Sequence, residues 1–506
     1  MTAGRSETPR RVGYGALIEM LDLDVIANWH ESLVAATSTH RVDATGDIVR
    51  ETYPEVYWPG DTVGDHLEFA LKYDGTNLSI LAEIFRKVDV TDVLTYVQSK
   101  PTGKYARRIW FLYEFLVGNR LPLDDLKRGN YVDLLDSDAY YTSNRTQQVR
   151  RQRINDNLLG DGRFCPIVRR TQRLSDFETA DLTQRCRQIV ASYPTQLLKR
   201  ALSYLYTKET KSSFEIERIT PSTDRTERFV TLLQLAERED FVDKDRLINL
   251  QNRIVDPRFA EEDYRRTQNY VGETLAWRQE RVHFACPKPE DIHDLMAGLI
   301  AAHQRMADGG VQAVVHAAAV SYGFVLMHPF EDGNGRIHRF LIHNIFARHG
   351  FTPEGVIFPV SAVMLKHPGA YDDSLEAFSR PVMSLVEFTL DAEGRMAVQN
   401  DTAGWYRYID MTPQAEALFS FVETTIDTEL VEELTFLANY DRTKAAIQGF
   451  VDMPDRKIDL FIRLCIQTNG RLSQRKRESH FDFLTADEIA LMEEAVRDGY
   501  GLVPTD

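Results

Sequence analysis

The chain has 506 residues, of which 43% are hydrophobic and 27% are charged, and its formal net charge is −16. This balance excludes a disordered or fibrous protein, and the length predicts about two to four domains with substantial cores. The acidic excess argues against nucleic acid as a partner of the whole chain.

No membrane partner is expected. The apolar run at 311–327 is short and is interrupted by polar side chains. The first residues include arginines but no apolar stretch behind them, so no secretion signal is predicted. Four cysteines lack paired spacing, which favours reduced thiols and a cytoplasmic location. They are Cys165, Cys186, Cys286 and Cys465.

The first part of the chain, residues 1–135, is predicted to be a helical N-terminal region. Its clearest buried helix is the apolar run at 107–117. Residues 136–205 are predicted to form an arginine-rich arm and a connecting helix. In an acidic protein these arginines are expected to serve as ion-pair partners. They are Arg145, Arg150, Arg151, Arg153, Arg163, Arg169, Arg170 and Arg173.

The second part of the chain is predicted to form a helical core domain at 206–380, with a helix near 212–220, and a C-terminal region at 381–506. The C-terminal region is predicted to open with a β-hairpin around a glycine-ended turn and to continue as helices. Its basic segment at 471–477 is interpreted as a solvated helix rather than a helix-turn-helix element. We therefore predict a mainly α fold, in which a helical core with a short β-hairpin is flanked by a helical N-terminal region and an α+β C-terminal region.

A short polar motif precedes the core. Residues 211–218 read Lys-Ser-Ser-Phe-Glu-Ile-Glu-Arg and contain Ser213 and Glu217 four positions apart. Ser212 as N-cap and Glu215 as its capping-box partner predict that a helix begins here and carries Glu217. Further on, residues 270–272 and 281–284 flank a polar stretch containing Trp277, and this pattern predicts a hairpin.

The most informative segment is 328–339, which reads His-Pro-Phe-Glu-Asp-Gly-Asn-Gly-Arg-Ile-His-Arg. Pro329 disfavours helical geometry before it, so the apolar helix should end near His328. A histidine with an ordinary pKa of about 6.5 can accept a proton from a hydroxyl at neutral pH. Phe330 is expected to anchor the loop in the core. Asp332 offers a hard oxygen ligand that suits Mg²⁺.

The glycine-framed turn that follows is suited to an anion. Gly333, Asn334 and Gly335 let the backbone approach closely, and a helix is expected to begin there with free N–H groups. Arg336 and Arg339 share one face of that helix and would clamp a polyphosphate. Each feature alone has an ordinary structural explanation, but together these explanations require several coincidences within twelve residues. Five other histidines lack metal-ligand spacing and are interpreted as structural or exposed: His303, His316, His338, His343 and His349.

This stretch resembles the signature of the Fic (filamentation induced by cAMP) family, HPFx(D/E)GNGRxxR, and fills every fixed position. The resemblance implies transfer of AMP from ATP to a side-chain hydroxyl of a protein. It implies that His328 is the base, that Asp332 holds Mg²⁺, and that Arg339 takes the γ-phosphate. The resemblance also implies that the phosphates rest on the segment Gly333–Arg336, including Asn334, Gly335 and Arg336. Kinase-like relatives carry lysine at the position of Gly335.

The upstream motif is similar to the family's inhibitory pattern, (S/T)xxxE(G/N). The resemblance implies that Glu217 pairs with Arg339 and occupies the γ-phosphate site, with Ser213 as the other fixed residue. Arg218 departs from the pattern, which has Gly or Asn there. The predicted hairpin at 270–284 is either the flap that holds a target peptide in this family or an ordinary connection. Tyr371 lies where relatives pack a helix near adenine, but its spacing favours a core residue.

These features predict an ATP- and Mg²⁺-dependent protein adenylyltransferase that is inhibited by its own Glu217. Its partners would be proteins modified on Ser, Thr or Tyr, itself included, and a homo-oligomer is compatible with the sequence. Two alternatives use the same site: removal of AMP, with Glu217 aligning a water, or transfer of UMP or phosphocholine. A third alternative is a regulatory, DNA-associated module that modifies only itself.

Overall fold

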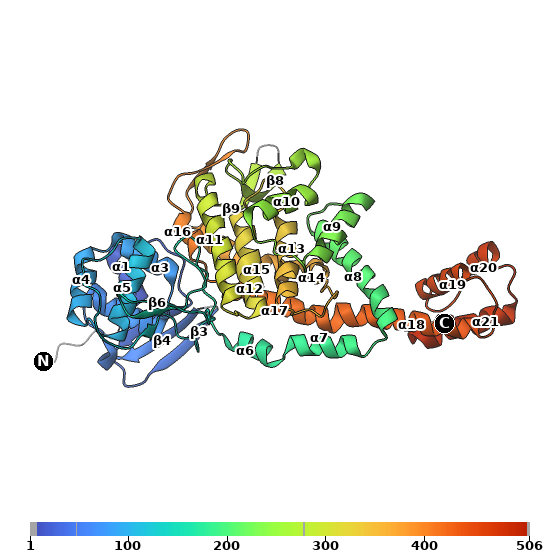
Figure 1. Cartoon of the computed structure of the whole chain (residues 1–506), viewed down its shortest axis with the longest axis horizontal. Coiled ribbons are helices and arrows are strands. Elements are labelled where there is room, and N and C mark those ends of the chain that lie inside the picture. The colour runs from blue at the N-terminus through green and yellow to red at the C-terminus, as the bar shows by residue number, and fades with distance from the viewer. Residues whose placement is uncertain (1–7, 47, 277–278, 503–506) are drawn as a thin grey trace.

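The computed structural model describes residues 8–46, 48–276 and 279–502. Its helices and small sheets form an elongated molecule with three parts along its long axis, an N-terminal unit, a central helical body and a small C-terminal unit (Figure 1). The body and the N-terminal unit have their own large apolar cores. Most elements are helical, so the predicted mainly α fold is confirmed.

The N-terminal unit corrects the prediction of a helical region, because it opens with a four-stranded sheet in the order β1-β2-β4-β3. Strands β2 and β4 are parallel, whereas β1 and β3 pair antiparallel with β2 and β4. The strands are short and mostly polar, so their period of two residues is weak in the sequence. They are β1 (Arg10–Arg11), β2 (His30–Ala35), β3 (Arg41–Thr45) and β4 (Ile48–Pro54).

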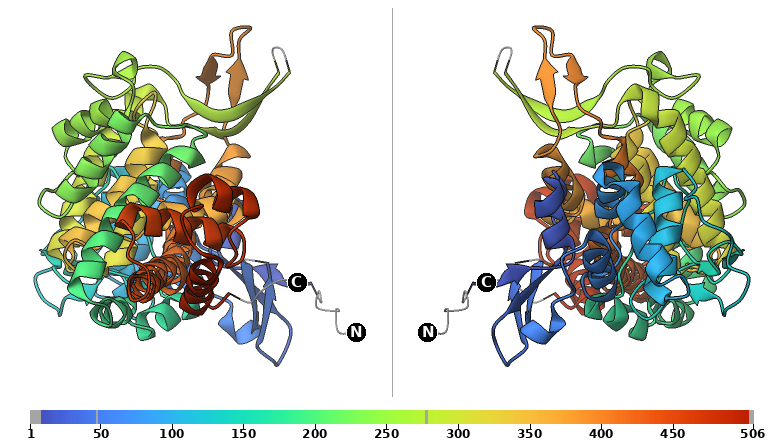
Figure 2. Two further views of the ribbon diagram at one scale, coloured as in Figure 1. Left: turned by 90° about the vertical axis from the view of Figure 1, so that its right-hand side faces the viewer. Right: turned by 90° about the vertical axis from the view of Figure 1, so that its left-hand side faces the viewer.

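Five helices complete this unit, and the last contains the predicted buried run at 107–117. They are α1 (Tyr14–Leu21), α2 (Val63–Phe69), α3 (Leu78–Lys87), α4 (Val90–Ser99) and α5 (Lys104–Val117). Short helical turns lie at Glu55–Tyr57 and Ala70–Asp74. Figure 2 shows the sheet projecting from the body on the side of the N-terminus.

The arginine-rich arm begins as a small sheet of β5 (Val132–Asp133), β6 (Gln147–Val149) and β7 (Ile154–Asp156), and continues as α6 (Gln172–Thr179) and α7 (Leu182–Ala191). Six of its eight arginines form ion pairs with carboxylates, as predicted. These are Arg145, Arg151, Arg163, Arg169, Arg170 and Arg173.

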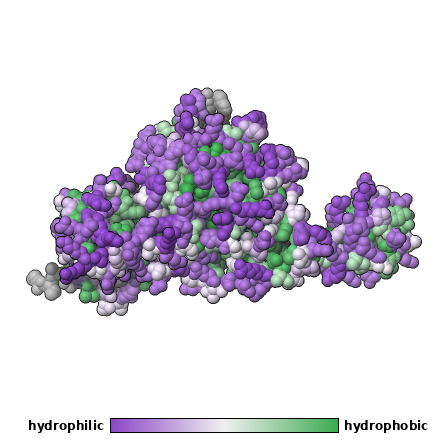
Figure 3. All heavy atoms as spheres, viewed as in Figure 1, coloured by the Kyte–Doolittle hydropathy of each residue, from purple (hydrophilic) through white to green (hydrophobic). Residues whose placement is uncertain are grey.

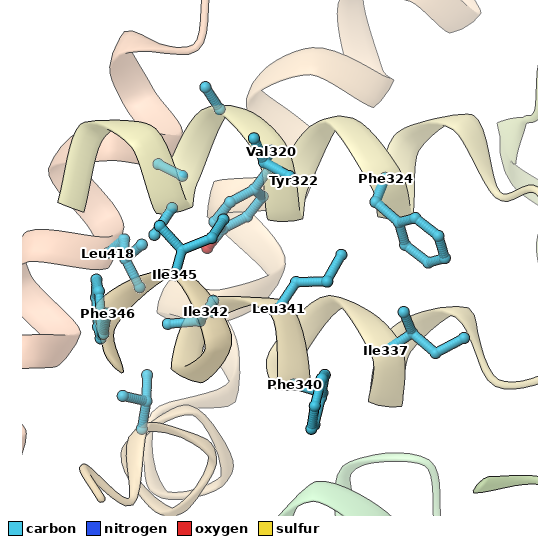
Figure 4. Close-up of a cluster of buried hydrophobic side chains, with 14 of the residues drawn as sticks. Val320, Tyr322, Phe324, Ile337, Phe340, Leu341, Ile342, Ile345, Phe346 and Leu418 are labelled. Carbon is cyan, nitrogen blue, oxygen red and sulfur yellow. The ribbon is translucent and has the colours of Figure 1, made fainter. Parts of the chain in front are cut away.

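The central body is built around α12 (Ala313–Met327), whose residues are almost all buried because they are apolar or small on every face. In Figure 4, Val320, Tyr322 and Phe324 of α12 face Ile337, Leu341 and Ile345 of α13. Around this pair pack α8 (Thr195–Ile216), α9 (Thr223–Leu235), α10 (Lys244–Ile254), α11 (Pro289–Asp308), α13 (Asn334–Arg348), α14 (Val360–Lys366) and α15 (Pro368–Met383).

Two antiparallel hairpins stand above this body (Figure 2). One consists of β8 (Tyr270–Ala276) and β9 (Gln279–Ala285), as predicted, although Trp277 lies outside the described residues. The other consists of β10 (Phe388–Leu390) and β11 (Met396–Val398), and it confirms the hairpin predicted at the start of the C-terminal region. A helical turn at Pro257–Phe259 precedes the first hairpin.

The chain then leaves the body along a nearly continuous rod of α17 (Thr412–Thr424), a π-helical turn at Thr425–Leu430 and α18 (Val431–Gln448), after the short α16 (Ala403–Arg407). The rod ends in a small unit with its own core, made with α19 (Asp455–Gln467), α20 (Gln474–His480) and α21 (Ala486–Tyr500). Helix α20 buries no residue, which fits a solvated basic helix.

The surface is mostly hydrophilic, with apolar residues gathered near the middle of the central body in this view (Figure 3). Within the described residues, no helix combines the length and the hydropathy that a membrane span requires.

Candidate active site

His328 caps the C-terminus of α12 in a left-handed conformation, with φ of 50°. Its Nδ1 lies 3.2 Å from the carbonyl oxygen of Val325. Because a carbonyl can only accept, Nδ1 carries the proton in the neutral ring, and Nε2 keeps a lone pair. Burial, reinforced by the Arg265 guanidinium, lowers the pKa of His328 to about 4. The ring is therefore neutral at pH 7 and able to accept a proton.

Arg265 positions the loop that begins at His328, and nothing in the sequence pointed to it. Its Nε donates to the carbonyl oxygen of His328 at 2.7 Å, and its backbone N–H donates to Pro329 at 2.8 Å. The other guanidinium nitrogens bond to the carbonyls of Thr267 and Pro287. All partners are backbone oxygens, which leave no signature in a sequence motif.

The turn between the two helices is closed by Asn334. Its amide nitrogen donates to the carbonyl of Phe330 at 2.7 Å, and its amide oxygen accepts the Phe330 N–H at 3.1 Å. Phe330 is fully buried, as predicted. The Asn334 side chain thus shapes the loop, and only its backbone N–H is left for an anion. Gly333 has φ of 95°, which favours glycine at the N-cap of α13.

Asp332 lies at the entrance of this turn with a side chain that is 41% exposed. Its Oδ1 accepts hydrogen bonds from the Gly333 N–H at 2.6 Å and from Nη2 of Arg336 at 2.5 Å. Its second oxygen has no hydrogen-bond partner within the described part of the chain and is free to meet a cation. A single carboxylate is enough for Mg²⁺ when substrate phosphates and waters supply the remaining ligands. The described residues include no cluster of three metal-binding side chains.

Arg336 has the chemistry of an anion ligand. Its side chain is 1% exposed, yet its Nε and Nη1 have no hydrogen-bond partner among the described residues. Unpaired buried donors are costly unless a ligand completes them. Arg336 lies in the first turn of α13, whose free N–H groups and dipole also favour a negative charge. A phosphate chain fits both features.

Glu217 and Arg339 meet beside the same helix terminus, as the motif predicted. Nη2 of Arg339 lies 2.8 Å from Oε1 of Glu217, and the Arg339 side chain is 2% exposed. Ser213 accepts from Arg339 through its hydroxyl at 3.0 Å and its carbonyl at 2.7 Å. A Cβ at Gly335 would lie 2.1 Å from Oε1 of Glu217. The carboxylate therefore rests on the N-terminus of α13, where an anion is favoured.

The motif that contains Ser213 and Glu217 lies at the end of a helix, which corrects the helix start predicted at Ser212. Helix α8 ends at Ile216, and Glu217 is its C-cap. The Arg218 N–H bonds to Glu215 at 2.8 Å, and the Ile219 N–H bonds to Phe214 at 3.0 Å. This is a Schellman motif, with Arg218 at φ of 57°. Glycine and asparagine adopt that conformation readily, which explains physically why the pattern has Gly or Asn there.

Two further predictions concern aromatic and histidine side chains. Tyr371 is buried, as expected for a core residue, but its hydroxyl also lies 3.4 Å from Nη1 of Arg339. The five other histidines are buried or partly buried and hold helices together. His303, His316 and His349 form a hydrogen-bonded chain, His338 packs on Tyr322, and His343 bonds to Glu209.

Comparison with known proteins identifies the central body. Residues 241–346 match the family model described as the Fic/DOC family, and this range contains His328, Asp332, Arg336 and Arg339. The chain contains a Fic/DOC domain. The segment around Glu217 lies outside the residues that match the Fic model.

Curated relatives share the Fic domain. The chain is 32% identical over 171 residues to the protein adenylyltransferase Fic of Culex quinquefasciatus, covering 31% of this chain and 30% of the relative. It is 31% identical over 140 residues to the protein adenylyltransferase fic-1 of Caenorhabditis elegans, covering 27% and 25%. The match thus spans less than a third of the length of either relative.

Among solved structures, the chain resembles a Fic family protein from Desulfovibrio desulfuricans G20 with a TM-score of 0.35 and 16% identity, over 66% of this chain and 86% of the other. At those values the likeness supports no conclusion about function.

Proposed function

We propose that this protein transfers AMP from ATP to a hydroxyl side chain of a target protein, and that Glu217 inhibits this reaction. The observation that carries the proposal is the buried Arg336 guanidinium, whose unpaired donors lie in the first turn of α13, in the same 328–339 segment as the neutral His328. This arrangement suits a polyphosphate and a general base. The adenylyltransferase names of the curated relatives support the choice of AMP.

His328 starts the reaction in this mechanism. Its Nε2 accepts the proton of the target hydroxyl while the hydroxyl oxygen attacks the α-phosphorus of ATP, and the bond from that phosphorus to the bridging oxygen of pyrophosphate breaks. The hydrogen bond from Nδ1 to Val325 keeps the ring in the required tautomer. Arg265 holds the backbone of His328 in place through its carbonyl.

The phosphates are held by the N-terminus of α13. Arg336 donates through Nε and Nη1, and the N–H groups of Asn334 and Gly335 add to the same anion site. Arg339 takes the γ-phosphate once Glu217 leaves. Mg²⁺ at Asp332 neutralises phosphate charge when bound. These groups are fixed before substrate arrives, so catalysis rests on positioning and charge stabilisation.

Glu217 inhibits because its carboxylate takes two positions that ATP needs, the N-terminus of α13 and the guanidinium of Arg339. A carboxylate and a γ-phosphate compete directly for these donors. The side chain of Glu217 is 34% exposed, so it can leave without unfolding the core. We place the reaction in a reducing compartment, the cytoplasm, because the four cysteines are buried free thiols.

The test uses ATP labelled at the α-phosphate, Mg²⁺ and host lysate, and compares wild type with Glu217→Gly and with Glu217→Gly combined with His328→Ala. Label on protein should rise in the single variant and disappear in the double variant. If Glu217→Gly binds ATP but transfers nothing, AMP transfer is wrong. If the wild-type protein removes AMP from a modified protein and Glu217→Gly does not, the reverse reaction is favoured.

A further inference from the structure

A second contact joins the inhibitory helix to the catalytic helix, one helical turn away from the contact between Ser213 and Arg339. Glu209 precedes Ser213 by four residues on α8, and His343 follows Arg339 by four residues on α13. The two helices therefore present matching side chains at the spacing of one turn. Nε2 of His343 lies 2.8 Å from Oε1 of Glu209.

The Glu209 carboxylate is enclosed by donors. The backbone N–H and the hydroxyl of Ser361 donate to its two oxygens at 2.9 and 2.5 Å, in addition to the His343 bond. Glu209 is 0% exposed and His343 is 6% exposed. This one carboxylate thus ties α8 to α13 and to α14 in the interior of the protein. Loss of any one partner leaves a buried charge or donor without compensation.

No step of the proposed reaction uses Glu209 or His343. Among the described residues, no hydrogen bond or ion pair joins either residue to the loop at 328–335 or to Glu217, since His343 lies one turn beyond Arg339 along α13. A buried pair of this kind does not add much stability compared with apolar residues, but it can fix one register of two packed elements. Here the register it fixes is the one in which Glu217 reaches Arg339.

We infer that Glu209 and His343 are positioning residues that hold the end of α8 in its inhibitory register. The inference rests on the proposed function, because it concerns the regulation of the same site. When the pair is broken, α8 loses its buried anchor, and Glu217 spends less time on Arg339 although its own side chain is intact. ATP then gains access to the γ-phosphate position.

The decisive variant is Glu209→Gln. It keeps the shape of the side chain but replaces one accepting oxygen with an amide N–H₂ group, which then faces the donors of His343 and Ser361. Transfer of label from α-labelled ATP should rise about tenfold over wild type, within the usual range of coupling between protein sites. In the Glu217→Gly background the same change should alter transfer by less than about twofold, because the contact between Glu217 and Arg339 is already absent. Equal loss of transfer in both backgrounds would show a merely structural role and overturn the inference.

His343 offers a matched pair of variants. His343→Gln retains a donor near Glu209 and should keep transfer close to the wild-type level, whereas His343→Leu removes the donor and should raise it. Asp240→Asn is the control, because Asp240 also pairs with a histidine, His303, at 3.0 Å, but its side chain is 42% exposed and no hydrogen bond or ion pair among the described residues joins it to α8. This control should leave transfer unchanged. If Glu209→Gln does not fold, Ser361→Ala removes one donor and takes its place.

Hydrogen exchange separates this inference from the proposed function. The N–H groups of Glu217, Arg218 and Ile219 are bonded to Phe214 and Glu215, so they report the docked end of α8. They should exchange faster in Glu209→Gln without any ATP. If Glu217→Gly transfers no label, the proposed function fails, and exchange alone decides the role of Glu209. Exchange that matches wild type in Glu209→Gln and His343→Leu would overturn the inference.

Discussion

Glu217 reaches Arg339 from the C-terminal cap of α8, and its Oε1 accepts a hydrogen bond of 2.8 Å from Nη2 of that arginine. The C-terminus of a helix disfavours a carboxylate, whereas the N-terminus of α13 favours one. The carboxylate of Glu217 is thus disfavoured by the C-terminus of α8 and stabilised by the N-terminus of α13. Any anion that binds the N-terminus of α13 more strongly can displace it.

The conformation of Arg218 destabilises the position in which Glu217 contacts Arg339. An L-residue other than Gly or Asn in the left-handed region costs about 1–2 kcal/mol. Arg218→Gly should therefore stabilise the Schellman motif and the docked position of Glu217, and should lower basal AMP transfer about fivefold. The assay is the α-labelled transfer of the otherwise wild-type protein. Arg218→Ala is the control, since it keeps the strain; an equal decrease in both variants would mean that Arg218 acts through its charge.

The low pKa of His328 predicts an unusual pH profile. The neutral ring is the base, so activity is lost as pH falls through the pKa of about 4. At pH 5 about nine-tenths of His328 should be neutral, against about 3% of a histidine with the ordinary pKa. The measurement is kcat/KM of the Glu217→Gly variant between pH 4 and 8, with a stability check at each pH. An acid limb centred near pH 6.5 would contradict the assignment.

The unpaired donors of Arg336 predict opposite effects on stability and affinity. Arg336→Gln removes two buried donors that lack partners among the described residues, together with one ion pair to the partly exposed Asp332, which is expected to contribute little. Its melting temperature should therefore stay about the same or rise. Its affinity for Mg²⁺-ATP should fall at least about tenfold, because charge-assisted hydrogen bonds to phosphate are lost. Calorimetry in the Glu217→Gly background measures both. Arg258→Gln, on an exposed side chain outside the site, should change neither.

The loop that carries His328 depends on the core beneath it. Phe330 is fully buried, and its truncation in Phe330→Ala should lower the free energy of unfolding by about 3–5 kcal/mol. Phe259 is 56% exposed, so Phe259→Ala should cost less than about 0.5 kcal/mol. Denaturant unfolding compares the two. A small loss in Phe330→Ala would show that the loop is not anchored through this ring.

The sequence predicted those parts of the site that lie close together in the chain. Pro329 predicted the end of α12, and the glycines predicted the start of α13. The contact of Glu217 with Arg339 was implied by the resemblance of the upstream motif to the family pattern. The prediction that a helix begins at Ser212 was wrong, because α8 ends just after this residue. Ser212 and Glu215 fit a capping box locally, but the apolar residues of α8 before them continue the same helix through both.

Contacts between distant segments could not be predicted. Arg265 binds backbone oxygens, and Glu209 meets His343 across 134 positions of sequence, so neither has a local pattern. The N-terminal strands were missed because their short, polar stretches bury few residues and show little alternation. Helices with a long apolar run, such as α5 and α12, were predicted because their own residues dictate them.

The most direct test of the account is the mass of the modified protein after Glu217→Gly reacts with ATP and Mg²⁺, measured together with the released phosphate species. The account predicts addition of an adenylyl group, release of one pyrophosphate for each group added, and no addition when His328→Ala is combined with it. Addition of a phosphoryl group, or release of ADP or orthophosphate in place of pyrophosphate, would contradict it.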